Sequence, residues 1–180
     1  MNARTRSHLI EGFDTTTPGA VPSKPALVAG YVDGRWPTYD LLRSEHPDAL
    51  ALSITVTGRT DALILDCENG DASIAGAVSW IIAMHRRGVW RPAVYLSMAR
   101  VVALEEAARK RAVARNGYRL WSAHWTDRAH ICGPECGLEG EPPGMTQYSD
   151  HGEHGENVDR SLTTRGWVMA VLKSEPGATA

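Results

Sequence analysis

Eight short strand-like runs within 180 residues restrict the folds open to this chain more than any other feature. The first six alternate with helical segments along the first two thirds of the sequence. Strands that alternate with helices form right-handed βαβ units, which build a parallel sheet. We therefore predict an α/β fold with eight mostly parallel strands.

The predicted strands are runs of apolar and β-branched residues bounded by turn formers. They cover residues 10–14, 26–32, 51–56, 62–67, 93–97, 118–125, 145–148 and 157–161. The run at 62–67, ALILDC, is almost entirely apolar, which is typical of a strand buried on both faces of a parallel sheet.

Helical periodicity predicts helices over residues 39–45, 74–87, 99–115 and 164–173. In the second of these, Ile74, Val78, Ile81 and Ile82 recur at helical spacing. Residues 126–162 show no helical period, so we expect helices after the earlier strands and few or none after the sixth.

The length of the chain limits the kind of barrel that these strands can form. A regular eightfold α/β barrel takes about 250 residues and rarely fewer than about 200, whereas this chain has 180. We therefore predict a compact, irregular TIM-type barrel over residues 10–174, with an N-terminal arm at 1–9 and a C-terminal tail at 175–180.

Composition and the N-terminal sequence exclude several function classes. The net charge is −2 and the pI about 6.4, so the chain lacks the basic surface that grips nucleic acid or an anionic membrane. No run approaches the roughly 20 apolar residues of a membrane span. The polar, basic start MNARTRSHLIEGF is not followed by an apolar run of a secretory signal, so we expect no signal peptide and synthesis in the cytoplasm.

Carboxylates at strand ends are the first candidate site. Asp14 ends the first predicted strand, and Asp66 and Glu68 end the fourth. Residues two apart on a strand point the same way, about 6.6 Å apart. Two close carboxyls do not both ionise readily, so such a pair supplies an acid and a base for a glycosidic bond. The alternative is that both residues cap the turn into the next helix.

Six short motifs add a family resemblance. GFD at 12–14, LDCE at 65–68, VYLS at 94–97, LWSAHW at 120–125, TQYSD at 146–150 and NVDRS at 157–161 follow the order and chemical character of the strand-end motifs of family 25 glycoside hydrolases, the lysozyme-like muramidases. GFDTTTP followed by AGYVDG is still more similar to the glycoside-hydrolase-like domain of unknown function found in actinobacterial and phage proteins. The resemblance spans about residues 10–165.

The resemblance implies a role for each matching carboxylate. Glu68 would be the general acid/base, and Asp66 would orient or stabilise an intermediate derived from the substrate. Asp14 and Asp159 would be supporting carboxylates in the pocket floor. The implied reaction is hydrolysis of a β-1,4 bond in peptidoglycan-type glycan with net retention, without a cofactor.

The resemblance also implies a sugar-binding groove. Its members would be aromatic residues, whose flat faces suit pyranose rings, and one amide that could hydrogen-bond a sugar hydroxyl: Tyr95, Trp121, Trp125, Tyr148 and Gln147. The alternative for Tyr95 and Trp121 is packing in the core.

Two departures from the muramidase pattern weigh against catalytic turnover and motivate an alternative. Only 52 residues separate Asp14 from Asp66, fewer than in the muramidases, and Arg160 replaces the usual residue after the last Val-Asp. The alternative is a non-catalytic structural or binding module on the same scaffold, such as a phage capsid decoration or tail protein. The expected partner is then a phage structural protein instead of bacterial cell-wall glycan, and the protein is carried in the virion or released at lysis.

A second cluster of reactive residues lies in the helix-free stretch. His130, Cys132 and Cys136 stand within seven residues, with His124, His151 and His154 nearby in the sequence. Three states stay open: free thiols, a disulfide that closes the loop, or zinc held by these three residues and one more histidine. Cys67 is expected to be a buried core thiol that points away from Asp66 and Glu68.

Overall fold

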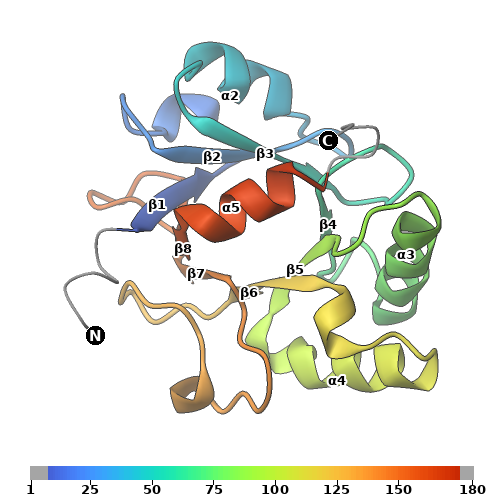
Figure 1. Cartoon of the computed structure of the whole chain (residues 1–180). Coiled ribbons are helices and arrows are strands. Elements are labelled where there is room, and N and C mark those ends of the chain that lie inside the picture. The colour runs from blue at the N-terminus through green and yellow to red at the C-terminus, as the bar shows by residue number, and fades with distance from the viewer. Residues whose placement is uncertain (1–7, 175–180) are drawn as a thin grey trace.

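The computed structural model describes residues 8–174, and its eight strands form one closed barrel (Figure 1). The strands follow chain order around the barrel, and β1 (Leu9–Asp14) pairs with both β2 (Leu27–Tyr31) and β8 (Asp159–Thr164). The prediction of an eight-stranded α/β barrel is confirmed. The predicted arm, up to residue 7, and the predicted tail lie outside the described residues.

Seven strands run parallel and the last runs back. After β1 and β2 come β3 (Leu50–Thr55), β4 (Ile64–Asp66), β5 (Ala93–Ser97), β6 (Arg119–Ala123) and β7 (Met145–Ser149), each parallel to its neighbour. β8 is antiparallel to both β7 and β1. An antiparallel strand needs no helical crossover, which explains how the barrel closes without a helix between β7 and β8.

Every predicted strand except 93–97 differs from the structure at one end or both, most by a single residue, and the largest differences are at β4, β6 and β8. β4 is only three residues long, and β6 is shorter at both ends than the predicted run. β8 begins two residues later than expected and continues to Thr164, because its last three residues pair with Leu9, Ile10 and Glu11 of β1. Long-range pairing therefore sets its end.

Four α-helices within residues 8–174 accompany the barrel. They are α2 (Tyr39–Glu45), α3 (Ile74–Arg86), α4 (Met98–Lys110) and α5 (Arg165–Leu172). The prediction that α4 reaches residue 115 is wrong: the helix ends at Lys110, and Ala112 then takes a left-handed φ of 55°. As expected, no α-helix lies between β6 and β8. None of the helices in residues 8–174 has the length and apolar character to cross a bilayer.

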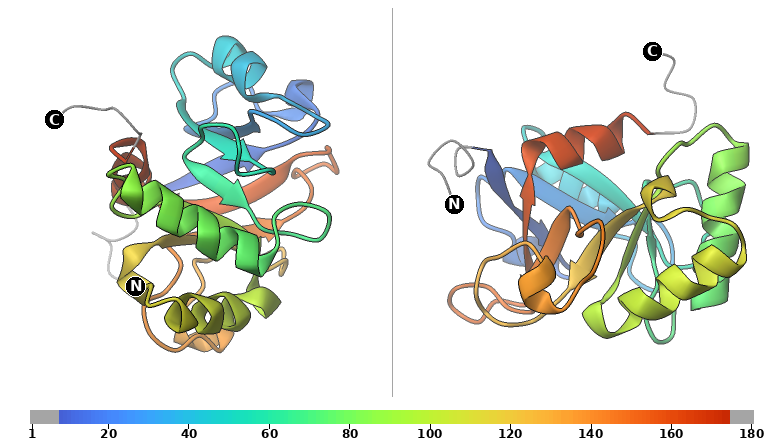
Figure 2. Two further views of the ribbon diagram at one scale, coloured as in Figure 1. Left: turned by 90° about the vertical axis from the view of Figure 1, so that its right-hand side faces the viewer. Right: turned by 60° about the horizontal axis from the view of Figure 1, so that its bottom comes forward.

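Three apolar cores hold the fold together, and the smallest packs Phe13, Val28 and Leu42 from β1, β2 and α2. α3 and α4 lie side by side on the outside of the barrel (Figure 2) and pack over the outer faces of β4, β5 and β6. The inside of the barrel is filled by large side chains such as Leu52, Ile64 and Trp121. Val168 and Val171 of α5 join this inner core, and α5 lies across one end of the barrel (Figure 1).

The position of α5 determines which end of the barrel can hold a site. α5 begins directly after β8, and Ile10 and Leu50, from the starts of β1 and β3, pack against the same core. α5 therefore covers the end where the parallel strands begin. The carboxyl ends of these strands lie at the opposite end, where parallel α/β barrels build their sites.

Candidate active site

The uncovered end of the barrel gathers carboxyl groups from three strands. Asp14 ends β1, Asp66 ends β4 with Glu68 two residues beyond, and Asp159 begins β8. Because β8 is antiparallel, its first residue lies opposite Asp14, the last residue of β1. Asp159, Asp66 and Glu68 all raise the pKa of Asp14. The structure thus brings together the four carboxylates that the sequence singled out.

Asp14 and Asp159 form a hydrogen-bonded pair with one proton. Burial raises the pKa of Asp14 well above its ordinary value, and the charge of Asp159 raises it further. Burial also raises the pKa of Asp159, to about 6, although hydrogen bonds from Gln147 and Asp14 oppose the rise. At neutral pH Asp14 therefore keeps its proton and donates it to the Asp159 carboxylate.

Asp66 and Glu68 form a second coupled pair. Burial, followed by the charges of Glu68 and Asp71, raises the pKa of Asp66 to about 8. Burial and then Asp71 also raise the pKa of Glu68. The Tyr31 hydroxyl donates to Asp66 Oδ2 at 3.5 Å. At neutral pH Asp66 therefore keeps its proton, and the raised pKa of Glu68 is the direction that a general acid requires.

Two carboxylate oxygens in this cluster have no protein partner. Asp14 Oδ1 and Asp66 Oδ1 are buried and accept no hydrogen bond from any described residue. A buried acceptor without a partner costs about 1–3 kcal/mol. Both oxygens are available to hydroxyl groups of a ligand or to water.

Two small pockets lie beside the carboxylates. One of about 220 Å³ is lined by Tyr31, Trp36, Asp66 and Glu68 among others. The other, about 60 Å³, is lined by Asp14 and Asp159 and shares Tyr31 with the first. Glu68 is only partly buried, so it is the member of its pair that a ligand in the larger pocket reaches more easily.

Three of the predicted groove residues, Trp121, Tyr95 and Gln147, are buried inside the barrel. Trp121 has no exposed surface; its ring lies 4.9 Å from that of Tyr95 at 66°, and its Nε1 donates to Ser161 Oγ at 3.0 Å. This burial leaves Trp121 no surface for a sugar, so we assign it to the core. The Tyr95 hydroxyl donates to Gln147 Oε1. Tyr95 and Gln147 lie next to the carboxylates. Burial, and then the charges of Asp14, Glu68 and Asp66, raise the pKa of Tyr95, and Gln147 hydrogen-bonds Asp159.

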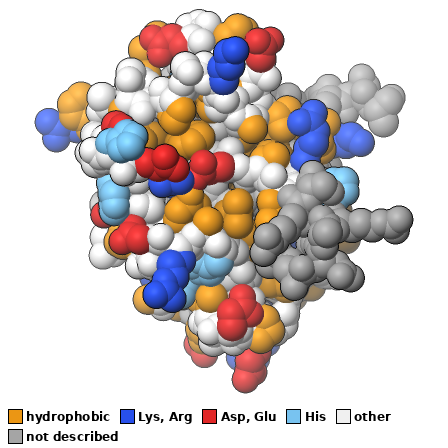
Figure 3. All heavy atoms as spheres, turned by 90° about the vertical axis from the view of Figure 1, so that its left-hand side faces the viewer, with side chains coloured by type: hydrophobic (Ala, Val, Ile, Leu, Met, Phe, Trp, Pro, Cys, Tyr) orange, Lys and Arg blue, Asp and Glu red, His pale blue; other side chains and the backbone are white. Residues whose placement is uncertain are grey.

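The other two predicted aromatic residues lie away from the pockets. The Tyr148 hydroxyl donates to Glu11, and the guanidinium of Arg160 lies 5.4 Å from the centre of the Tyr148 ring. These contacts lie outside the barrel, because the neighbouring Gln147 faces Tyr95 in its interior. Figure 3 shows the side of the molecule that is on the left in Figure 1, where charged groups lie among hydrophobic ones. Trp125 is exposed after β6 and lines neither pocket. The structure does not bring Tyr148 or Trp125 to the carboxylates.

Of the residues that line the larger pocket, the sequence predicted only Asp66 and Glu68; Tyr31, Trp36 and Asp71 are among those it missed. Tyr31 ends β2, Trp36 follows in the next loop with 53% of its surface exposed, and Asp71 follows β4. The signal was the segment YVDGRW, a polar and aromatic run directly after a buried strand. Asp33 in the same run holds the loop in place, because it accepts hydrogen bonds from Thr55 Oγ1 at 2.7 Å and from the Val56 amide at 2.8 Å.

The cysteine and histidine residues form a separate group. His130, Cys132 and Cys136 meet His124 beside the β6–β7 connection. No disulfide joins Cys132 to Cys136, and Cys67 is buried in the outer core with Leu65 and Leu96.

No protein-family model and no curated protein matches this sequence. The barrel and the chemistry of its carboxylates are therefore the features that bear on function.

The raised pKa of Asp66 predicts a pH-dependent gain in stability for Asp66→Asn. The unfolded carboxyl ionises near 3.8 but the folded one near 8, so between these pH values the native state holds more protons and wild-type stability falls as pH rises. We expect Asp66→Asn to be more stable than wild type by about 2–4 kcal/mol at pH 8, with the difference vanishing below about pH 4. Urea unfolding at both pH values measures this.

Asp61→Asn is the matched control, because Asp61 is largely exposed and pairs with Arg87 at 2.8 Å. A surface change of this kind shifts stability by no more than about 0.5 kcal/mol. An Asp66→Asn protein that is no more stable than wild type at pH 8 would show that this carboxylate is well solvated or stably paired in the folded protein.

Proposed function

We propose that this protein is a glycoside hydrolase that cleaves a β-1,4 bond of peptidoglycan-type glycan with net retention. The observation that carries the proposal is the convergence of Asp14, Asp66, Glu68 and Asp159 at the open end of a closed eight-stranded barrel. Paired carboxyls with raised pKa values are the groups that cleave glycosidic bonds. The resemblance to family 25 glycoside hydrolases supports the same reaction.

Glu68 is the proposed general acid/base. It lines the larger pocket with Asp66 and is the more exposed of the two. In the first step Glu68 gives its proton to the leaving glycosidic oxygen while the substrate's own 2-acetamido oxygen attacks the anomeric carbon. In the second step Glu68 takes a proton from the water that reopens this intermediate, so the configuration is retained.

The other carboxylates position and stabilise this chemistry. Asp66, which keeps its proton at neutral pH, orients the acetamido group through a hydrogen bond. The Asp14–Asp159 pair lies beside it with one negative charge at neutral pH. We also propose that the barrel is a shortened TIM-type barrel, which the strand order and the placement of the carboxylates support.

Trp36 is the proposed sugar platform. It is exposed at the edge of the larger pocket, and the guanidinium of Arg35 lies 4.9 Å from the centre of its ring. The pocket, about 220 Å³, is smaller than the 300–1,000 Å³ or so of a typical ligand site. It therefore suits one ring of a glycan whose other rings lie on the surface beside Trp36.

A non-catalytic module on the same scaffold is the second candidate. The observation in its favour is burial, because Asp14 and Asp66 are only 3% and 2% exposed. Such a module would bind glycan, or a phage structural protein, without cleaving a bond.

Incubation of the purified protein with bacterial peptidoglycan sacculi tests the proposal. We expect new reducing ends and soluble glycan fragments, detected by mass spectrometry. Trp36→Ala is expected to raise the half-saturating glycan concentration about fivefold, which corresponds to roughly 1 kcal/mol of aromatic contact. Trp90→Ala, at an exposed position that lines neither pocket, is the matched control.

The two candidates give different results in this experiment. Sacculi of several chemotypes that bind the folded protein but release no fragments would favour the non-catalytic module. If Trp36→Ala releases fragments with the same half-saturating glycan concentration as wild type, Trp36 does not bind the glycan. The proposed hydrolase activity would still hold.

A further inference from the structure

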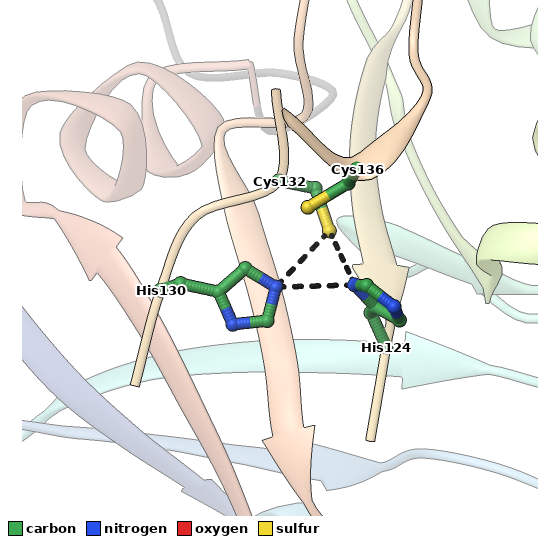
Figure 4. A group of neighbouring side chains, drawn as sticks. All are labelled: His124, His130, Cys132 and Cys136. Carbon is green, nitrogen blue, oxygen red and sulfur yellow. Dashed lines mark hydrogen bonds between the residues drawn. The ribbon is translucent and has the colours of Figure 1, made fainter. Parts of the chain in front are cut away.

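The connection between β6 and β7 gathers four metal-binding side chains. Its residues 124–144 contain no α-helix or strand and only one short 3₁₀ turn, η3 (Pro134–Cys136). His124, His130, Cys132 and Cys136 point toward one another at the side of β6 and β7 (Figure 4). One ligand atom of each lies within 4.8 Å of those of the other three.

The spacing of these atoms matches a tetrahedral metal site. His124 Nδ1 lies 3.1 Å from His130 Nε2, and Cys132 Sγ lies 3.4 Å and 3.5 Å from these two nitrogens. Zinc bonds of about 2.0–2.1 Å to nitrogen and 2.3 Å to sulfur place two nitrogens about 3.3 Å apart and a nitrogen and a sulfur about 3.5 Å apart. Three of the four ligand atoms already have this spacing.

The donor set selects the metal. Two cysteines and two histidines in a tetrahedral arrangement are the ligands of structural zinc, and two thiolates balance its double charge. Calcium and magnesium prefer oxygen ligands, and the cluster contains no carboxylate.

Contacts around the cluster orient its ligands. His130 Nδ1 lies 2.7 Å from the carbonyl oxygen of Arg128, so an N–H at this position donates there and leaves the Nε2 lone pair free for a metal. The Cys132 amide donates to Thr146 Oγ1 on β7 at 2.9 Å, and the His124 amide donates to the Gln147 carbonyl at 2.8 Å. The ligands are therefore anchored to the barrel wall.

We propose that His124, His130, Cys132 and Cys136 bind one structural Zn²⁺ ion that fixes the β6–β7 connection to the barrel. All four positions are filled by protein, which is the mark of a structural rather than a catalytic zinc site. The ion would stabilise a long segment that has almost no secondary structure of its own. This inference is independent of the proposed hydrolysis.

Metal content of the full-length protein tests the inference. The protein is expressed without a histidine tag, purified with a non-chelating reductant and analysed by elemental mass spectrometry. We expect about one zinc per chain and a fall in Tm when a chelator removes it. After zinc is replaced by Co²⁺, we expect the visible absorption of a tetrahedral cobalt site with thiolate ligands.

Variants separate metal binding from folding. Cys136→Ser and His130→Ala should each weaken Co²⁺ binding by more than the 10–100-fold or so that loss of an outer contact costs. His154→Ala and Cys67→Ala, outside the cluster, should keep the wild-type affinity. If Cys136→Ser does not fold, Cys136→His preserves four ligands and should bind Co²⁺ with weaker sulfur-to-metal charge-transfer absorption.

Two results would overturn the inference. One is reduced, folded protein with less than about 0.2 zinc per chain that also gives no tetrahedral Co²⁺ spectrum. The other is a Cys132–Cys136 disulfide whose reduction yields a protein that binds neither metal.

Discussion

Glu68→Gln is expected to slow glycan hydrolysis by about 10²–10⁴-fold, the contribution of a positioned general acid/base. The amide has nearly the shape of the carboxyl group but neither gives a proton to the leaving oxygen nor takes one from water. Glu68 is partly exposed beside the larger pocket, so the substitution should leave the fold intact. Initial rates of reducing-end release, with a thermal melt of each protein, measure both effects.

Glu139→Gln is the matched control for this prediction, because Glu139 is exposed and lines neither pocket beside the carboxylates. Its rate should equal that of wild type. Equal rates of hydrolysis for wild type and Glu68→Gln would show that Glu68 is not the general acid/base. Asp66→Asn adds a second comparison, since it should lose activity while gaining stability at pH 8, a combination typical of a strained functional residue.

Trp121→Ala is expected to destabilise the protein by about 3–5 kcal/mol, the usual cost of removing a buried tryptophan. Trp121 is completely buried inside the barrel, packs edge-on against Tyr95 and donates to Ser161. The substitution therefore leaves both a cavity and an unpaired hydroxyl. For a chain of this size the Tm should fall by about 6–20 °C, measured by calorimetry or circular dichroism.

Trp125→Ala tests the opposite assignment four residues further along the chain, beyond the end of β6. Trp125 is 58% exposed after β6, so its loss should change stability by no more than about 0.5 kcal/mol. A Trp121→Ala protein as stable as wild type but unable to bind glycan would show that this side chain faces the substrate, as the family resemblance implies.

The barrel was predictable because each of its strands can be recognised from a short stretch of sequence. Short apolar runs such as ALILDC and AVYLS end at turn formers. The structure has the predicted number of strands in the predicted order. The end of α4 was not predictable, because the helical pattern continues to residue 115 whereas the backbone turns at Ala112 with a positive φ. The extent of β8 depends on pairing with β1, which no local window contains.

The candidate site was predictable only in part. Asp14 and Asp66 could be found because they end strands that a barrel brings to one rim, whereas Asp159 was implied only by the family resemblance. The positions of the aromatic side chains were harder to predict. Whether such a residue faces the inside or the outside of the barrel, and how far it lies from the rim, depends on the exact strand register. Gln147 faces Tyr95 inside the barrel, so its neighbour Tyr148 faces out.

The fourth member of the cysteine and histidine cluster also required the fold. His130, Cys132 and Cys136 are close in sequence, but His124, His151 and His154 were equal candidates to join them. The position of His124 at the end of β6, where its amide bonds to β7, brings its ring to the thiols.

Proton NMR of the first product formed from a defined peptidoglycan oligosaccharide tests the proposed retaining hydrolysis most directly. A site in which Glu68 acts beside Asp66 on the substrate's own acetamido group releases the β-anomer first, and the α-anomer then grows in by mutarotation. We expect this β-first signal from wild type and none from Glu68→Gln. Release of the α-anomer first, or no product from folded wild-type protein, would contradict it.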